Sequence, residues 1–220
     1  MMKEFVDQLL LLNDQDWGKY AFGREPLVGK LSREQLLMYY RKASDCGIEL
    51  ARNIRSKYAG KSINECAMLE GAKVQIADME QEGLQTVFAT FIEPDIITLY
   101  KDNADRTDTL IKEEGLAERL GSVDTLDLLT AHELFHFLEL KIPDIYTRQK
   151  HLTLFKLWKL ENKSRIMCLG EIGAMAFARE FTGLKCSPYL YDVLMLYVCN
   201  PQKAKQQYDN MMEFFKEANL

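Results

Sequence analysis

The chain has 220 residues, of which 47% are hydrophobic and 28% are charged, and its formal net charge is −5. These values are ordinary for a folded globular protein with one sizeable core. The acidic balance gives no electrostatic reason to expect nucleic-acid binding, and no segment approaches the roughly 20 apolar residues of a membrane helix. We therefore expect neither a nucleic-acid nor a membrane partner, and the oligomeric state stays open.

The N-terminus and the cysteines indicate a cytoplasmic protein. The N-terminal apolar run, Leu9 to Leu12, follows the acidic Glu4 and Asp7 and precedes no small-residue cleavage site, so it does not resemble a targeting segment. The five cysteines are odd in number and contain no CxxC pair. This pattern favours free thiols in a reducing compartment over disulfides or a cysteine-bound metal.

Helical patterns dominate the first third of the chain. They predict a long helix over Ser32–Tyr58 and a short one over Ser62–Gly71. Each begins with a serine three residues before a Gln or Glu, which is the capping-box pattern. We interpret residues 1–60 as a helical N-terminal extension and residues 61–220 as the main domain, the two forming one compact unit.

A small sheet is predicted next. The segments Ala72–Ala77, Thr86–Ile92 and Ile96–Tyr100 are short and rich in β-branched and aromatic residues, which favours strands. Pro94-Asp95 separates the last two segments and is typical of a turn. The sequence therefore predicts about three strands in this region.

The rest of the chain is mainly helical in pattern. The apolar residues of His151–Leu160 are the exception, because they fit a strand or a short helix equally well. The predicted helices cover Asp108–Leu120, a segment from Ser122 or Asp124 to Pro143, Ser164–Phe181, a segment from Pro188 to Pro201, and Pro201–Ala218. The expected fold class is α+β and mostly helical.

The helix that ends at Pro143 carries a His-Glu-x-x-His motif at residues 132–136. Residues four apart lie on one face of a helix, so His132 and His136 can bind the same metal ion. Neutral imidazoles suit Zn²⁺, which keeps one position open for water in catalytic sites. Glu133 lies at the edge of that face, where its carboxylate can act as the general base for water activated by the metal.

A third ligand is needed, and Glu171 is the best candidate. It is the only charged residue between Arg165 and Arg179, in a segment of apolar and small residues. Such a carboxylate is costly unless it is paired or bound to a metal. Gly170 and Gly173 add little bulk, so this helix can approach the motif helix closely.

Other residues are weaker candidates. The metzincin continuation is absent, because Glu139 and Ile142 occupy its positions. Glu139 can instead orient His136 as a hydrogen-bond acceptor. His151 can act as a ligand or as a donor to the oxyanion, with no spacing that favours either role. The other possible oxyanion donors are Tyr146, Tyr189 and Tyr191.

A ferritin-like di-iron site is excluded by the histidine count. Glu133 and His136 form one ExxH pair, and the di-iron site needs a second pair on another helix. The only other histidine is His151, and Arg148 stands three positions before it.

The order of these elements resembles that of the ImmA/IrrE family of zincin-like metallopeptidases. There a short helix, a small sheet, the motif helix and a later helix with a glutamate and a Phe-Ala pair follow one another. In this chain that order covers roughly residues 62–185, with Glu171 and Phe177-Ala178 on the later helix. The resemblance implies a small sheet packed on the motif helix and zinc-dependent cleavage of a peptide or protein substrate, often a partner regulator.

The chain departs from the family at three points. Phe135 replaces the usual glycine of the motif, and Gly173 stands where a second glutamate is common. The gap from His136 to Glu171 is also long, so the relationship is a distant one. Two functions therefore stay open, a zinc metallopeptidase with Glu133 as its base, or a catalytically silent zincin-like module that binds a partner protein.

Overall fold

The computed structural model describes residues 2–77, 87–157 and 160–217, and the fold is α+β and mostly helical, as the sequence predicts. Two predicted segment ends, Thr86 and Ala218, lie outside the described residues. The helices are α1 (Met2–Leu9), α2 (Asp14–Gly23), the 3-10 helix η1 (Val28–Lys30), α3 (Arg33–Lys57), α4 (Ile63–Glu70), α5 (Lys101–Glu113), α6 (Ala117–Leu120), α7 (Thr125–Lys141), α8 (Tyr146–Gln149), α9 (Cys168–Thr182), α10 (Tyr189–Cys199) and α11 (Pro201–Glu217). The strands are β1 (Lys73–Ala77), β2 (Ala89–Ile92), β3 (Ile96–Tyr100), β4 (His151–Leu157) and β5 (Leu160–Arg165).

The three predicted strands form one sheet in the order β1-β3-β2. β3 lies in the centre, parallel to β1 and antiparallel to β2, with Ile96 opposite both Lys73 and Ile92. Its Ile97 and Leu99 are buried, because the sheet covers α7. β2 is an edge strand, and no other described strand pairs with its outer side.

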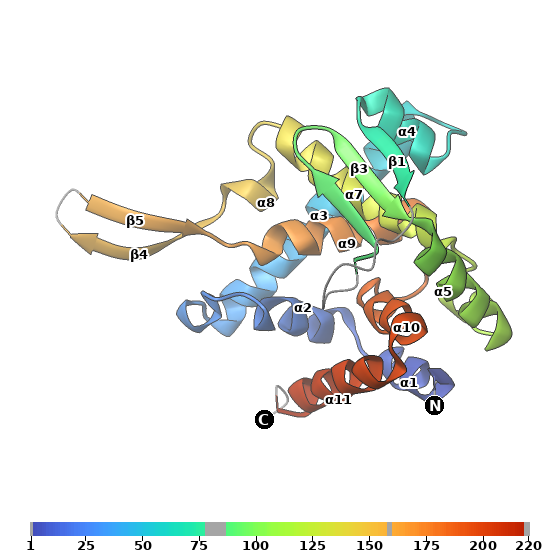
Figure 1. Ribbon diagram of the computed structural model, residues 1–220. Coiled ribbons are helices and arrows are strands. Elements are labelled where there is room, and N and C mark those ends of the chain that lie inside the picture. Colours follow the sequence, from blue (N-terminus) through green and yellow to red (C-terminus); the bar gives the residue numbers. More distant parts are fainter. Residues whose placement is uncertain (1, 78–86, 158–159, 218–220) are drawn as a thin grey trace.

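The motif helix α7 lies at the centre of the fold (Figure 1). It contacts β2 and β3 on one side and α9 on another, and α4 and α5 pack against it as well. Asp124 caps its N-terminus by accepting hydrogen bonds from the backbone N–H groups of Leu126 and Asp127. This resolves the choice between Ser122 and Asp124 in favour of Asp124. Both predicted capping boxes, which begin at Ser32 and Ser62, are also present.

The N-terminal helices belong to the core. α3 packs along α9, and the two backbones are so close that a Cβ atom on Gly47 would lie 2.2 Å from the carbonyl oxygen of Gly173. Only glycine allows this approach. Phe22, Ala43 and Ala51 are buried in the same core. α2 contacts α3, α9 and α11, so residues 1–60 support the helix that carries Glu171.

Two predicted helices have different bounds in the structure. The helix predicted from Asp108 begins at Lys101 and is divided into α5 and α6, because Gly115 adopts a left-handed conformation with φ of +65°. The helix predicted from Ser164 begins only at Cys168. Ser164 belongs instead to β5, where it pairs with Leu152 of β4.

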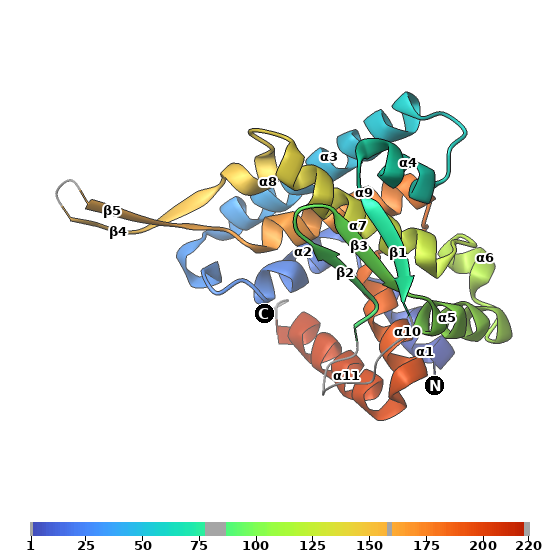
Figure 2. The ribbon, with the colours of Figure 1, turned by 45° about the horizontal axis from the view of Figure 1, so that its top comes forward.

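In the undecided segment His151–Leu160, residues 151–157 form a strand, Leu160 begins the next strand, and residues 158–159 lie outside the described residues. β4 and β5 form an antiparallel hairpin that projects away from the rest of the molecule (Figures 1 and 2). The short helices α1, α2 and α8 had no individual sequence prediction.

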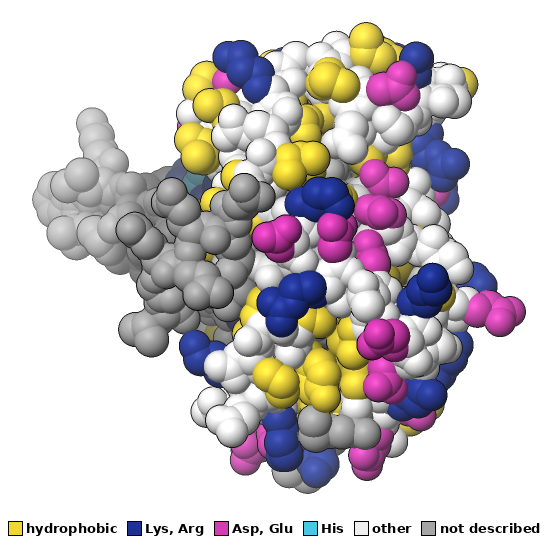
Figure 3. All heavy atoms as spheres, turned by 45° about the vertical axis from the view of Figure 1, so that its right-hand side comes forward, with side chains coloured by type: hydrophobic (Ala, Val, Ile, Leu, Met, Phe, Trp, Pro, Cys, Tyr) yellow, Lys and Arg dark blue, Asp and Glu magenta, His cyan; other side chains and the backbone are white. Residues whose placement is uncertain are grey.

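The surface charges, the helices and the cysteines bear on the expectations about nucleic acid, membranes and disulfides. On the face shown in Figure 3, basic side chains are scattered among acidic ones and do not gather in one area. Within residues 2–77, 87–157 and 160–217, no helix has the length and apolar character needed to cross a membrane. All five cysteines are free thiols.

Candidate metal centre

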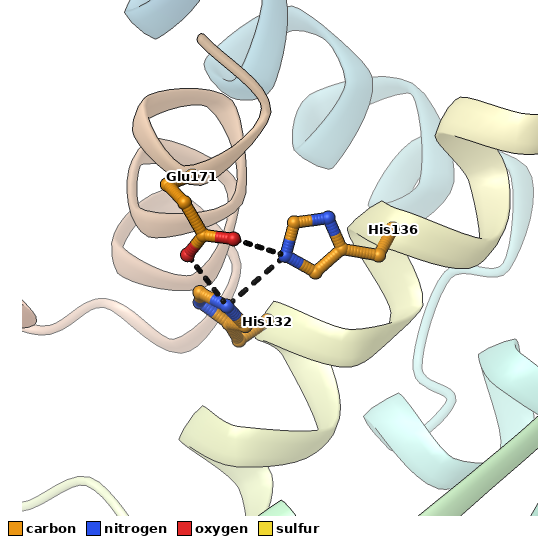
Figure 4. A group of neighbouring side chains, drawn as sticks. All are labelled: His132, His136 and Glu171. Carbon is orange, nitrogen blue, oxygen red and sulfur yellow. Dashed lines mark hydrogen bonds and ion pairs between the residues drawn. The ribbon is translucent and has the colours of Figure 1, made fainter. Parts of the chain in front are cut away.

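Three predicted ligands meet between α7 and α9. His132 and His136 project from α7 toward α9, and the carboxylate of Glu171 on α9 points at both imidazoles (Figure 4). The two Nε2 atoms are 3.2 Å apart. Glu171 Oε2 lies 3.5 Å from His132 Nε2, and Glu171 Oε1 lies 3.3 Å from His136 Nε2.

These separations fit a tetrahedral zinc site. Two atoms that are each about 2.0–2.1 Å from zinc and subtend a tetrahedral angle lie about 3.3 Å apart. The three measured separations scatter around that value. Two histidine nitrogens and one carboxylate oxygen are also the donor set of many catalytic zinc sites, which keep the fourth position for water or substrate. The residues present therefore fit zinc.

The electrostatics of the cluster favour a cation. Burial alone would lower the pKa of His136, but the carboxylates of Glu139 and Glu171 outweigh it and raise that pKa to about 10. Desolvation opposes ionisation of Glu171, yet the two imidazoles lower its pKa well below the usual range. The side chains thus stabilise positive charge at the point where they meet.

Glu171 is more exposed than the sequence suggests. The surrounding residues Cys168, Leu169, Ile172 and Ala174 are buried, but the side chain of Glu171 is 55% exposed. Its carboxylate therefore reaches solvent as well as the two imidazoles, and the apolar residues beside it in the sequence do not enclose it. Glu171 lies on the one face of α9 that meets the cavities beside α7.

Glu139 lies behind His136, as expected for an orienting acceptor. Its side chain is 7% exposed, and its Oε2 atom is 3.9 Å from His136 Nδ1. Burial would raise the pKa of Glu139, but His136 holds it below the usual value. Gly170 provides the space for this carboxylate, because a Cβ atom there would lie 3.2 Å from Glu139 Oε1.

The two departures from the family motif are in contact with each other. The ring of Phe135 is fully buried against α9, and a Cβ atom on Gly173 would lie 2.4 Å from Phe135 Cζ. A large residue on α7 thus occupies the space that a small residue leaves on α9. This contact fixes the spacing of the two helices that supply the ligands.

Two cavities meet at the cluster, and His132, Glu133 and Glu171 line both of them. The first, here the apolar cavity, has a volume of about 510 Å³ and is lined largely by apolar side chains, among them Leu128, Leu129, Met175 and Met195. The second, here the charged cavity, has a volume of about 370 Å³ and includes Glu93, Glu139, Arg148 and Arg165.

Glu133 lies beside the ligand cluster. It borders both cavities next to the first ligand. Within the described part of the chain, its carboxylate has no hydrogen-bond or ion-pair partner. It is therefore free to accept a proton from a molecule bound at the cluster.

Of the other candidates, the structure places Tyr189 and Tyr191 in the apolar cavity with the ligands, whereas His151 and Tyr146 line neither cavity. His151 is exposed at the base of the hairpin, where its Nδ1–H donates to the carbonyl oxygen of Gln149. Tyr189 and Tyr191 line the apolar cavity, but their hydroxyl oxygens are buried and have no hydrogen-bond partner among the described residues. The hydroxyl of Tyr146 is likewise buried, and burial raises its pKa to about 12.

The N-terminal region contributes residues that the sequence did not indicate. Arg24 and Glu25 line the apolar cavity, and the buried Glu25 accepts a hydrogen bond of 3.0 Å from the backbone N–H of Cys168. A carboxylate at the first residue of α9 stabilises that helix end. Arg24 forms an ion pair of 3.8 Å with Asp192. No local pattern indicates contacts between residues so far apart in the chain.

Comparison of the chain with known protein families, with curated proteins and with solved structures finds no match. A functional assignment therefore depends on the geometry of the site and on its sequence motif. The motif supplies two histidines and a glutamate on one helix, and the geometry adds a second glutamate from a neighbouring helix.

Proposed function

We propose that the protein is a zinc-dependent peptidase with a zincin-like arrangement of sheet and motif helix. The observation that carries the proposal is the convergence of three ligand atoms at tetrahedral spacing beside the unpartnered carboxylate of Glu133. His132, His136 and Glu171 are the proposed ligands. The five free thiols are consistent with action in the cytoplasm.

Each residue has a defined task in this proposal. When bound, zinc polarises the substrate carbonyl and lowers the pKa of water. Glu133 accepts the proton of the attacking water on its carboxylate and delivers it to the leaving amine. Glu139 holds the ring of His136 in place from behind. Phe135 and Gly173 keep α7 and α9 at the required distance.

The position of the edge strand β2 between the two cavities favours a peptide as the substrate. Ala89 lines both cavities, Phe88 lines the apolar cavity, and Thr90 and Phe91 line the charged cavity. An extended peptide can add to the outer side of such a strand through backbone hydrogen bonds. A peptide bond near the middle of this substrate would then lie over the cluster of His132, His136 and Glu171.

One observation favours the alternative, a catalytically silent module that binds a partner protein. The hydroxyl oxygens of Tyr146, Tyr189 and Tyr191, the candidates for stabilising an oxyanion, are buried from solvent. Such stabilisation is commonly a large part of catalysis of acyl transfer. The alternative therefore predicts peptide binding without hydrolysis.

The test combines metal analysis with cleavage of a peptide library. Purified protein should contain one zinc per chain, and the wild type should cleave peptides that Glu133→Gln leaves intact while keeping its zinc. Glu180→Gln, on the same helix as Glu171 but outside both cavities, is the matched control and should cleave normally. Zinc binding without any cleavage would favour the silent module, and absence of bound metal would refute the peptidase and the metal site.

A further inference from the structure

We propose that the substrate carries an acidic residue just before the cleaved bond and a large apolar residue just after it. This inference rests on the proposed peptidase function and adds the specificity of the same site. It follows from the different chemistry of the two cavities and from the direction of β2 between them.

The apolar cavity fits a large apolar side chain. Its volume of about 510 Å³ exceeds that of any single side chain, and Leu128, Leu129 and Met175 form part of its wall. The one arginine in this cavity, Arg24, already has partners, because it pairs with Asp192 and donates to the hydroxyl of Tyr20. Burial of an apolar side chain is therefore the main favourable interaction that the cavity offers.

Two arginines of the charged cavity have no hydrogen-bond or ion-pair partner among the described residues. Arg148 on α8 and Arg165 at the end of β5 are both half-buried. Neither guanidinium forms a hydrogen bond or ion pair with any described residue, although Arg165 is close enough to Glu139 to help lower its pKa. A partly desolvated guanidinium gains most from a carboxylate, which it can bind with two parallel hydrogen bonds.

The carboxylates of the same cavity do not replace that partner. Glu139 and Glu171 face the histidines, and Glu133 borders the cluster. Glu93 is exposed at the turn after β2. With a divalent cation at the cluster, the cavity is close to neutral, so an added carboxylate meets two arginines and no net repulsion.

The direction of β2 sets the order of the two residues. From Phe88 to Phe91 the chain runs from the apolar cavity to the charged cavity. Antiparallel pairing is slightly more stable per residue than parallel pairing, and a peptide paired in this way with β2 runs the opposite way, from the charged cavity to the apolar one. The acidic residue therefore precedes the cluster and the apolar residue follows it.

The test uses four decapeptides that differ only at the two central positions, Glu-Leu, Gln-Leu, Lys-Leu and Glu-Ser. For the zinc-loaded wild type we expect kcat/KM to fall about 10-fold from Glu-Leu to Gln-Leu and further for Lys-Leu. The change to Glu-Ser should cost roughly 10- to 100-fold. In Arg148→Gln/Arg165→Gln the preference for Glu over Gln should disappear, whereas the exposed Arg33→Gln should keep it.

A binding measurement separates this inference from the proposed function. Fluorescein-labelled copies of the four peptides are titrated with zinc-loaded Glu133→Gln, and the Kd values should rank as the cleavage rates do. The same ranking without any cleavage by the wild type would support the two subsites and reject the peptidase. Cleavage without a Glu preference, a Lys preference, or an unchanged preference in the double arginine variant would overturn the subsite assignment. Circular dichroism and zinc content confirm that each variant is folded.

Discussion

The two faces of α7 have opposite properties. On the buried face that packs against Gly173 of α9, Phe135 is fully buried and its ring fills the place that a Cβ atom on Gly173 would need. On the face toward the cavities, His132 and His136 keep about a fifth of their side-chain surface exposed, at 18% and 20%, and are surrounded by charged groups. The packed face holds the helices in register, whereas the cavity face places charged and polar groups where a ligand can reach them.

This difference separates stability from function. Changes on the packed face should lower the free energy of unfolding through steric overlap. Changes on the cavity face should alter metal or substrate binding and leave the metal-free fold intact, or even stabilise it, because charged groups near a cavity are held there at a cost. Four predictions test this separation, in order of expected effect.

The largest effect concerns the metal. At free zinc about a thousandfold above Kd, bound zinc should add about 4 kcal/mol to the free energy of unfolding of the wild type. Glu171→Gln should lose most of this gain, because a neutral amide is a poor zinc ligand, and its metal-free stability should fall by less than the lost zinc effect, since the carboxylate also pairs with the two imidazoles. Urea unfolding with zinc and with a chelator measures both quantities. Glu180→Gln should keep the zinc effect, and a full zinc effect in Glu171→Gln would remove Glu171 from the ligand set.

The next effect lies on the packed side of α9. Gly47→Ala should destabilise the metal-free protein by about 3 kcal/mol, because its Cβ atom would lie 2.2 Å from the carbonyl oxygen of Gly173, and backbone cannot yield as a side-chain tip can. Gly29→Ala is the matched control, since no atom lies within 4 Å of the Cβ position there, and its stability should stay within about 0.5 kcal/mol. Equal unfolding curves for the two variants would contradict the close approach of α3 and α9.

A smaller effect is expected between α7 and α9. Gly173→Ala should cost about 2 kcal/mol, because its Cβ atom would lie 2.4 Å from Phe135 Cζ, which is the movable end of a side chain. In a Phe135→Leu background the same change should cost about 1 kcal/mol less, since the shorter side chain leaves room. A double-mutant cycle by urea unfolding measures this coupling. Independent, additive effects would show that the two residues do not set the spacing of α7 and α9.

The sequence was sufficient where the relevant contacts are local. The capping boxes at Ser32 and Ser62 and the motif histidines four residues apart all depend on neighbours within one helical turn, and the structure has them as predicted. Glu171 was found because one charge stands out among small and apolar residues. Its position on the cavity face, with 55% of the side chain exposed, was not predictable, because exposure depends on the other elements that surround it.

The features that the sequence did not predict depend on contacts between distant parts of the chain. Glu25 meets the start of α9 at Cys168, across 143 positions, and no periodic pattern records such a meeting. The pairing of Ser164 with Leu152 prevailed over the helical pattern that begins near the same residue. The arginines of the charged cavity, Arg148 and Arg165, come from α8 and β5, whose relative placement only the folded chain determines.

The smallest expected effect on stability concerns Asp192, on the cavity side. Asp192 lines the apolar cavity with His132, and burial raises its pKa from 3.8 to about 6. Because the folded pKa is above the unfolded value, ionisation of Asp192 opposes folding. The penalty is absent below about pH 3, where both states are protonated, and nearly complete above about pH 7. Asp192→Asn should therefore be more stable than the wild type by about 1–2 kcal/mol at pH 7.5, and most of the difference should be lost near pH 4. Urea unfolding of both proteins in chelator at the two pH values measures it. A variant that is less stable at pH 7.5 would mean that the ion pair between Asp192 and Arg24 outweighs the burial, and that the cavity face contributes to stability in the same way as the packed face.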